Sequence, residues 1–221
     1  MIKKWMADIR EKTKDMNREQ AFEYIRNYYW YHILIAGVLF ALLILVIYHI
    51  GWGDRRKDFY CALVNQQIDF DRDRRIAHDF AEKSGIREKS ISVNSDYQIS
   101  YPGKELEDIN ESSYEKFFFN WAEGDMDAVV MPESFYRYCL EQDGEYADLK
   151  SWAEDAGMDA ETLIEDEVLY EEQGSFPALY INKTCLSDSV KTGTDDPVLL
   201  VFPKDAGHEA NGRKFFEYVL K

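Results

Sequence analysis

The sequence has few of the features that mark an enzyme or a metalloprotein. Its 221 residues include only three cysteines and four histidines, with no Cys-x-x-Cys pair. It contains no Gly-x-Ser-x-Gly nucleophile motif, no phosphate-binding loop and no His-Glu-x-x-His zinc motif. His208 is followed by glutamate but lacks the second histidine one helical turn later. We therefore expect no catalytic site, no metal site and no cofactor.

Basic residues are also scarce, at 26 against 42 acidic residues, which gives a net charge of -16. An acidic surface repels a phosphate backbone, and no basic cluster or RNA-binding motif offsets it, so we expect no nucleic-acid partner. The charge is unevenly distributed. Residues 1–32 carry seven basic and five acidic side chains, whereas residues 59–221 carry 16 basic and 35 acidic ones.

A single long stretch, residues 33–50, contains no charged residue. As a helix, it would rise about 27 Å, close to the thickness of a bilayer's hydrocarbon core. Tyr28 and Trp30 precede it, and Tyr48 and Trp52 stand at its far end, as in the aromatic belts at membrane interfaces. The long preceding segment and the absence of an Ala-x-Ala site argue against a cleaved signal peptide. The stretch predicts an uncleaved transmembrane anchor in the lipid bilayer.

These features divide the chain into a tail (1–32), a transmembrane helix (33–50), a linker (51–57) and a body (58–221). Seven lysines and arginines precede the span and three follow directly, so the positive-inside rule predicts a cytoplasmic N-terminus. The body would then lie outside the cell membrane. Helical spacing of the tail's apolar residues predicts an amphipathic helix on the inner leaflet. Those residues are Trp5, Ile9, Phe22, Ile25 and Tyr29.

Within the body, short apolar runs alternate with segments of helical periodicity. We expect strands at 58–65, 90–100, 127–131, 175–184 and 196–203. Helices are expected at 69–85, 112–125, 132–144 and 207–221. This alternation predicts a three-layer α/β domain with a mainly parallel sheet.

Two alternative site interpretations concern aspartates and cysteines. Residues 69–73 place aspartate at alternate positions, as in a calcium loop, but Arg74 stands where the loop needs glycine, so a helix start is the better interpretation. Outside the cell, one pair among Cys61, Cys139 and Cys185 could form a disulfide, leaving one free thiol. The sequence selects no pair, and the absence of any bridge is equally compatible with it.

Short polar side chains follow three of the expected strands. Ligands of parallel α/β sheets bind beyond the carboxyl ends of strands, near helix N-termini. The candidate ligand-binding residues are therefore Asn65, Asn94, Ser95, Glu133 and Ser134. The alternative is that they cap helices and close turns. Because Glu133 would repel an anion, we expect any small solute to be neutral or cationic.

The segment GDMDAVVMPESFYRYCLEQDGEYADL (124–149) resembles part of the extracytoplasmic solute-binding proteins of bacterial ABC importers. The ending is also similar to that family, in FPALYIN and in the final helix with Phe215, Phe216, Tyr218 and Leu220. The resemblance implies a periplasmic-binding-protein-like (type II) fold. The body is about half the family's usual length, and a membrane helix replaces the lipid-anchored cysteine.

Two functions follow as expectations. The first is a single-pass membrane protein with a non-catalytic, extracytoplasmic solute-binding-like domain, acting as a binding or interaction module beside a transporter or signalling complex. The second is a structural scaffold or assembly subunit of a membrane complex, with a vestigial pocket. A membrane-anchored hydrolase is the third alternative, and it lacks a recognisable nucleophile–base pair.

Overall fold

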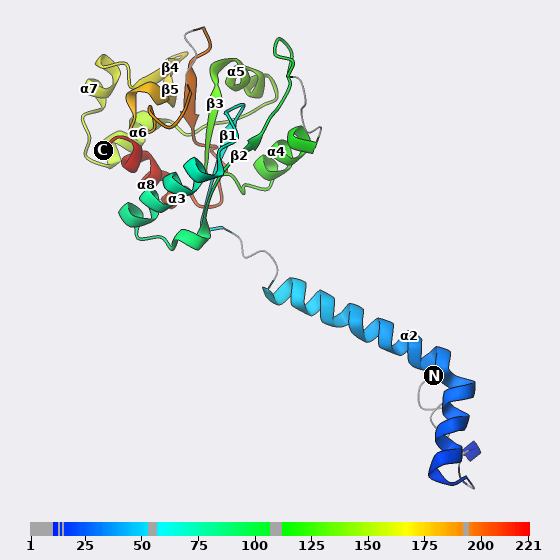
Figure 1. The fold of residues 1–221 in the computed structure, drawn as a ribbon. Helices are drawn as coiled ribbons and strands as arrows, with labels where there is room; N and C mark the ends of the chain where they lie inside the picture. The colour runs from blue at the N-terminus through cyan, green and yellow to red at the C-terminus, as the bar shows by residue number, and fades with distance from the viewer. Residues whose placement is uncertain (1–10, 13, 15, 53–56, 107–111, 192–194) are drawn as a thin grey trace. The chain divides into compact units, whose positions relative to one another are not determined.

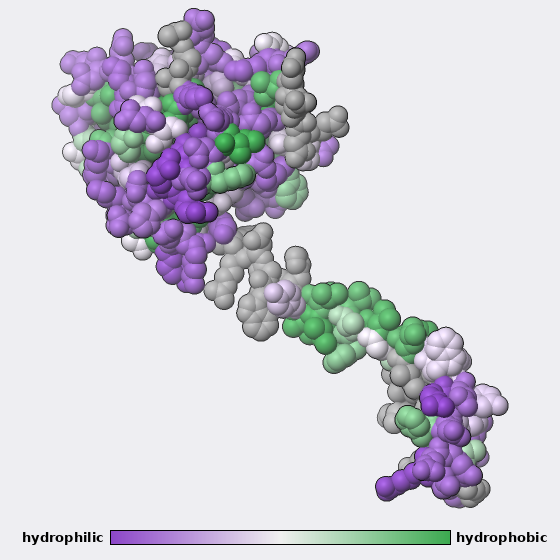
Figure 2. Space-filling view, in the orientation of Figure 1, coloured by the Kyte–Doolittle hydropathy of each residue, from purple (hydrophilic) through white to green (hydrophobic). Residues whose placement is uncertain are grey.

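The computed structural model describes residues 11–12, 14, 16–52, 57–106, 112–191 and 195–221, and the chain divides into two compact units, 1–55 and 56–221. The first unit contains helix α2 (Arg18–Trp52). Its stretch Trp30–Tyr48 is long and apolar enough to cross a membrane, and Figure 2 shows hydrophobic side chains covering this part of the helix. Trp5 and Ile9 of the expected amphipathic tail, and residues 53–56 of the linker, lie outside the described residues.

The second unit is an α/β domain (Figure 1). In chain order its elements are β1 (Phe59–Val64), α3 (Phe70–Ser84), η1 (Glu88–Ser90), β2 (Ile91–Tyr97), α4 (Ser112–Ala122), β3 (Ala128–Pro132), α5 (Glu133–Glu141), α6 (Leu149–Asp155), α7 (Ala160–Glu165), β4 (Leu169–Glu172), β5 (Ser175–Tyr180), η2 (Ile181–Lys183), β6 (Val198–Val201) and α8 (Glu209–Val219).

The six strands form a mixed sheet with the order β2-β1-β3-β6-β5-β4. Strand β1 is parallel to β2 and β3, whereas the β3–β6, β6–β5 and β5–β4 pairs are antiparallel. The expectation of a mainly parallel sheet is therefore wrong. The physical reason is in the connections: Gln173 and Gly174, with φ of 52° and 83°, close a tight β4–β5 hairpin, and such hairpins join antiparallel strands.

Helices cover both faces of the sheet, because alternate side chains of the central strands enter two separate cores. Helices α3, α6 and α8 supply the first core, and α4 and α5 supply the second. In the first, the ring of Phe59 on β1 lies 4.7 Å from that of Phe80 and 4.8 Å from that of Phe215. In the second, the rings of Phe117 and Phe135 are 5.2 Å apart. The result is three layers.

The three cysteines are free, which answers the question that the sequence left open. Cys61 is buried in the first core and Cys139 in the second, on opposite faces of the sheet. Burial raises the pKa of both thiols, that of Cys139 to about 12. Cys185 is exposed. Both buried thiols are therefore packing groups that stay protonated at neutral pH.

Candidate functional site

The five candidate ligand-binding residues lie at or near the carboxyl edge shared by β1, β2 and β3. The structure does not bring all of them together. It places them in several hydrogen-bonded groups, and each candidate side chain is bonded within the chain. We therefore asked which hydrogen-bonding groups at this edge remain free for a solute.

Asn65 directly follows β1 and has a positive φ of 54°, a conformation that asparagine tolerates. Its side-chain amide donates a hydrogen bond to the Ile99 carbonyl at 2.9 Å and accepts one from the Ile99 N–H at 2.7 Å. The side chain thus replaces a main-chain ladder and joins the end of β1 to the segment that follows β2. Its role in the structure is that of a turn-closing residue.

Ser95 is fully buried and belongs to a charged network at the start of α3. Its N–H and hydroxyl donate to Asp73 Oδ2 at 2.9 and 2.6 Å, while Asp73 Oδ1 accepts from the buried Arg72 guanidinium at 2.9 Å. Asp69 caps α3 by accepting from the N–H groups of Asp71 and Arg72. The helix-start interpretation of these aspartates is confirmed, since Asp69 bonds to the helix N-terminus.

Asn94, the neighbour of Ser95 in β2, points to the opposite face of the sheet, as alternation along a strand requires. Its side chain donates to the Tyr60 hydroxyl at 3.1 Å and accepts from the Asp96 N–H at 2.8 Å. Tyr60 in turn bonds to the Tyr97 hydroxyl at 2.8 Å. Asn94 therefore belongs to a tyrosine network in the second core and does not join the other candidates.

Ser134 lies at the N-terminus of α5, where an incoming ligand would be expected. That position is occupied by Asp196 of the same chain, which accepts from the Ser134 N–H at 3.0 Å and from its hydroxyl at 2.8 Å. The Ser134 hydroxyl also bonds to the Tyr101 hydroxyl at 2.7 Å, and Lys104 pairs with Asp196 at 3.1 Å. Partial burial alone would raise the pKa of Asp196, but the bonds from Ser134 and Lys104 lower it.

Glu133 is the first residue of α5 and forms a separate pair with Arg137, one helical turn later, at 2.7 Å. The Tyr170 hydroxyl, from β4, lies 3.1 Å from the same carboxylate oxygen. The Glu133 N–H donates to the Pro197 carbonyl at 2.8 Å. Both candidates on α5 are thus engaged with their own chain: Ser134 with the segment that leads into β6, and the Glu133 carboxylate with Arg137 and Tyr170.

Sequence reasoning missed Tyr101 and Asp196, the two partners of Ser134. Asp196 reaches the N-terminus of α5 because β6 is antiparallel to β3, so that Val198 at the start of β6 pairs with Pro132 at the end of β3. In a parallel arrangement the start of β6 would lie at the opposite edge of the sheet. The signal in the sequence was the acidic pair before Pro197, Asp195 and Asp196. It indicates a partner for the N-terminus of α5 only once the direction of β6 is known.

A buried aspartate and a histidine meet at the opposite, amino edge of the sheet. Asp127 accepts from the main-chain N–H groups of Tyr60 at 2.8 Å and His208 at 3.1 Å, and the His208 ring lies 3.4 Å away. Burial raises the pKa of Asp127 to about 6, although the hydrogen bonds and the histidine lower it. In the described residues no serine, threonine or cysteine is hydrogen-bonded to His208. The pair joins β1, β3 and the start of α8 and has the geometry of a structural clamp.

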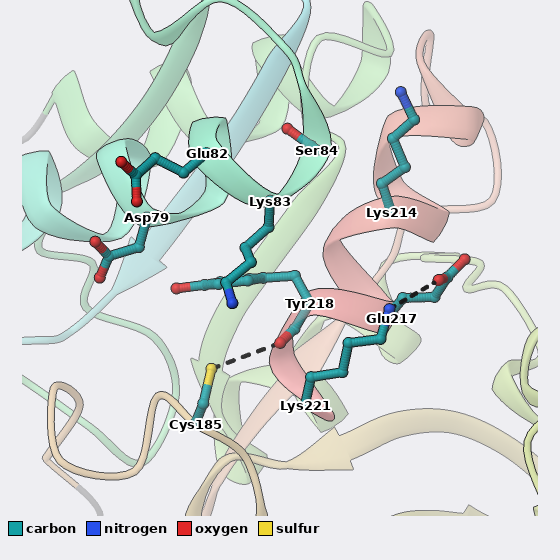
Figure 3. Close-up of a pocket in the computed structure, with 9 residues that line it drawn as sticks. All are labelled: Asp79, Glu82, Lys83, Ser84, Cys185, Lys214, Glu217, Tyr218 and Lys221. Atoms are coloured by element: carbon teal, nitrogen blue, oxygen red, sulfur yellow. Dashed lines mark hydrogen bonds and ion pairs between the residues drawn. The ribbon is translucent and has the colours of Figure 1, made fainter.

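A cavity of about 500 Å³ lies beside α3 and α8 (Figure 3). Its walls mix acids and bases, and Lys221 pairs with Glu217 at 3.4 Å. Cys185 donates to the Tyr218 carbonyl at 3.8 Å, and partial burial raises the pKa of its thiol. In Figure 3 the Lys214 side chain extends away from Cys185. The charges do not converge on one point, and no three histidine, cysteine or acidic groups in the described residues are arranged to hold a metal ion.

Comparison of the chain with protein-family models, curated proteins and solved structures gives no match in any of the three.

Proposed function

We propose that the protein is a single-pass membrane protein whose α/β domain is a non-catalytic interaction module outside the cell. The observation that carries the proposal is the state of the carboxyl edge. Each of the five side chains that could hold a solute there is bonded within the chain, and Asp196 occupies the N-terminus of α5.

A solute at this edge would have to displace those bonds. An anion would meet the carboxylates of Glu133 and Asp196, and a cation would compete with Arg137 and Lys104, which already pair with them. Replacing a satisfied internal bond with a ligand bond gains little free energy. The same observation favours a role as scaffold or assembly subunit of a membrane complex over solute capture at this edge.

Helix α2 supports the membrane anchor through its apolar stretch, and the basic tail before it supports a cytoplasmic N-terminus. We further propose that the domain is a reduced, single-lobed relative of the solute-binding proteins of ABC importers. Support comes from residues 124–149 and the final helix, together with the parallel β2-β1-β3 half of a sheet covered by helices on both faces.

An exposed aromatic side chain on α4 suits a protein partner. Phe119 is 64% exposed, on the same helix as Tyr114, which is 38% exposed. Aromatic residues are enriched in protein interfaces, where they supply most of the binding energy. The proposed partner is a membrane protein, such as a transporter or signalling complex, that contacts the surface around Phe119.

Site-specific photocrosslinking in native membranes tests this proposal. A photoreactive residue at position 119 is compared with one at position 70, because Phe70 is similarly exposed, at 65%, on a different helix. The proposal predicts one discrete membrane-protein adduct at 119 and none at 70. It fails if both positions give the same adducts or neither gives any. It fails also if a solute stabilises the full-length protein and Ser134→Ala abolishes that effect.

A further inference from the structure

A row of apolar and aromatic side chains runs along α4 and continues onto α5. Tyr114, Phe118 and Ala122 are spaced four residues apart on α4, so they lie one above the other on the helix surface. The Tyr114 and Phe118 rings are 4.7 Å apart, and the Tyr114 hydroxyl bonds to the Tyr138 hydroxyl of α5 at 2.8 Å. These four residues and Phe119, all at least partly exposed, are here called the α4–α5 face.

Two carboxylates flank the exposed ring of Phe119. Glu115 and Glu123 stand four residues before and after it, and the Glu123 N–H still donates to the Phe119 carbonyl at 3.0 Å, so all three lie in one row. Both glutamates are exposed, and neither side chain forms an ion pair or hydrogen bond within the described residues. The chain itself therefore leaves two negative charges beside Phe119 uncompensated.

A third carboxylate, Glu141, lies at the α5 side of the face. The hydrogen bond with Tyr114, followed by removal from water, raises the pKa of Tyr138 to about 12, and the negative charge of Glu141 makes a smaller contribution. Glu141 is exposed and likewise has no ion pair in the described part of the chain. Since Tyr138 stays neutral, carboxylates set the charge on this side.

The basic side chains of the two helices do not neutralise these carboxylates. The single base of α4 is Lys116, and its ammonium group lies over the ring of Tyr97, 5.1 Å from the ring centre. The single base of α5 is Arg137, which pairs with Glu133 at 2.7 Å. The α4–α5 face is therefore an aromatic surface with a negative rim.

We propose that the α4–α5 face binds a basic, amphipathic segment of the partner protein. Its lysine or arginine side chains would pair with Glu115, Glu123 and Glu141, while an apolar side chain packs on Phe119. In such interfaces aromatic anchors supply most of the binding energy, and complementary charges select the partner and speed association. The inference rests on the proposed interaction function and adds the chemistry of the partner.

Two other occupants would meet electrostatic repulsion. A second copy docking through the same face would bring the three glutamates against their equivalents across a two-fold axis. The body as a whole also repels its own copy, because residues 59–221 carry 35 acidic against 16 basic side chains. The anionic headgroups of a membrane surface would be repelled in the same way. A basic protein segment is the occupant that the charges favour.

Photocrosslinking from position 119 in native membranes is the first test. Glu115→Lys combined with Glu123→Lys reverses the charge beside the photoreactive residue. Glu154→Lys combined with Glu165→Lys is the control, because it makes the same change of net charge at exposed, unpaired glutamates on α6 and α7. We expect the first pair to lower the yield of the protein adduct at least about tenfold and the control pair to change it less than about twofold.

An equal yield from the unchanged protein and both double variants would overturn the inference and leave the interaction function standing. An adduct with lipid, or with a second copy of the chain, would also overturn it. The absence of any native adduct would count against the interaction function itself, and a defined probe then decides the inference.

The probe is a short amphipathic peptide of leucine and lysine, added to the full-length protein in a neutral detergent. A leucine–glutamate peptide of the same length is the charge control. We expect a saturable adduct at position 119 with the lysine peptide alone, weakened by added salt and by Glu115→Lys combined with Glu123→Lys. The inference is wrong if the lysine peptide gives no saturable adduct, or if both peptides label position 119 equally.

Discussion

Tyr101, at the carboxyl edge of the sheet, and Tyr136, on α5, are both almost fully buried but differ in their bonding. The Tyr101 hydroxyl is bonded to Ser134, which is bonded to Asp196, whereas no hydrogen bond of the Tyr136 hydroxyl is found in the described part of the chain. The edge was the expected ligand site because of its polar composition and its position. The comparison teaches that polar composition at a sheet edge does not by itself leave hydrogen-bonding capacity free for a solute.

The strongest way to break this comparison is to disrupt the network that holds Ser95. Asp73→Ala leaves the buried Arg72 guanidinium unpaired, which costs about 3–5 kcal/mol of the free energy of unfolding. Urea unfolding of the full-length protein, followed by near-ultraviolet circular dichroism, measures the loss. Asp71→Ala is the control, since Asp71 is 82% exposed and should leave stability nearly unchanged. If Asp73→Ala and Asp71→Ala lowered the free energy of unfolding by equally small amounts, the network around Asp73 would not be structural.

The next prediction concerns the amino edge of the sheet, where Asp127 should make the free energy of unfolding depend on pH. The folded-state pKa of Asp127, about 6, lies above the ordinary aspartate value of 3.8. Its contribution to stability is therefore fully present below about pH 4 and is lost as pH rises to about 6. Asp127→Asn removes the carboxylate and with it this slope. Identical pH slopes for wild type and variant would contradict the assigned pKa.

A smaller effect concerns the residue that fills the α5 N-terminus. Asp196→Ala removes two hydrogen bonds to Ser134 and the ion pair with Lys104, which should cost about 1–2 kcal/mol of stability. Asp195→Ala, at the exposed neighbouring position, should have little effect. Chemical denaturation of both variants measures the difference. If Asp196→Ala left the free energy of unfolding unchanged, the edge would be open to a solute after all.

Strands β1 and β3 of the parallel half are predictable from sequence because they are continuous apolar runs, each followed by a helix. The run FYCALV became β1 (Phe59–Val64), and AVVMP became β3 (Ala128–Pro132). Strand β4 escaped prediction because its four residues, LYEE, include two glutamates in an acidic region. The direction of β6 escaped too, since it depends on the tertiary position of the hairpin before it.

The bonding state of the candidate site could not be predicted for a related reason. Ser134 and Asp196 are 62 positions apart, and only the antiparallel placement of β6 brings them into contact. Tyr136 gives the sequence an aromatic residue on a helix face, which predicts burial. It does not indicate whether the hydroxyl at the end of the ring finds a partner, because that depends on β4 and on the loop after α5.

The most direct test of the contrast between the two regions is the free energy of unfolding of Tyr101→Phe and Tyr136→Phe, measured side by side in the full-length protein without added solute. Each change removes one hydroxyl from a buried ring. Tyr101→Phe loses an internal hydrogen bond and should cost about 1 kcal/mol, while Tyr136→Phe removes an unpaired group and should cost less than about 0.5 kcal/mol or stabilise the fold. Equal costs, or a larger cost for Tyr136→Phe, would contradict the account.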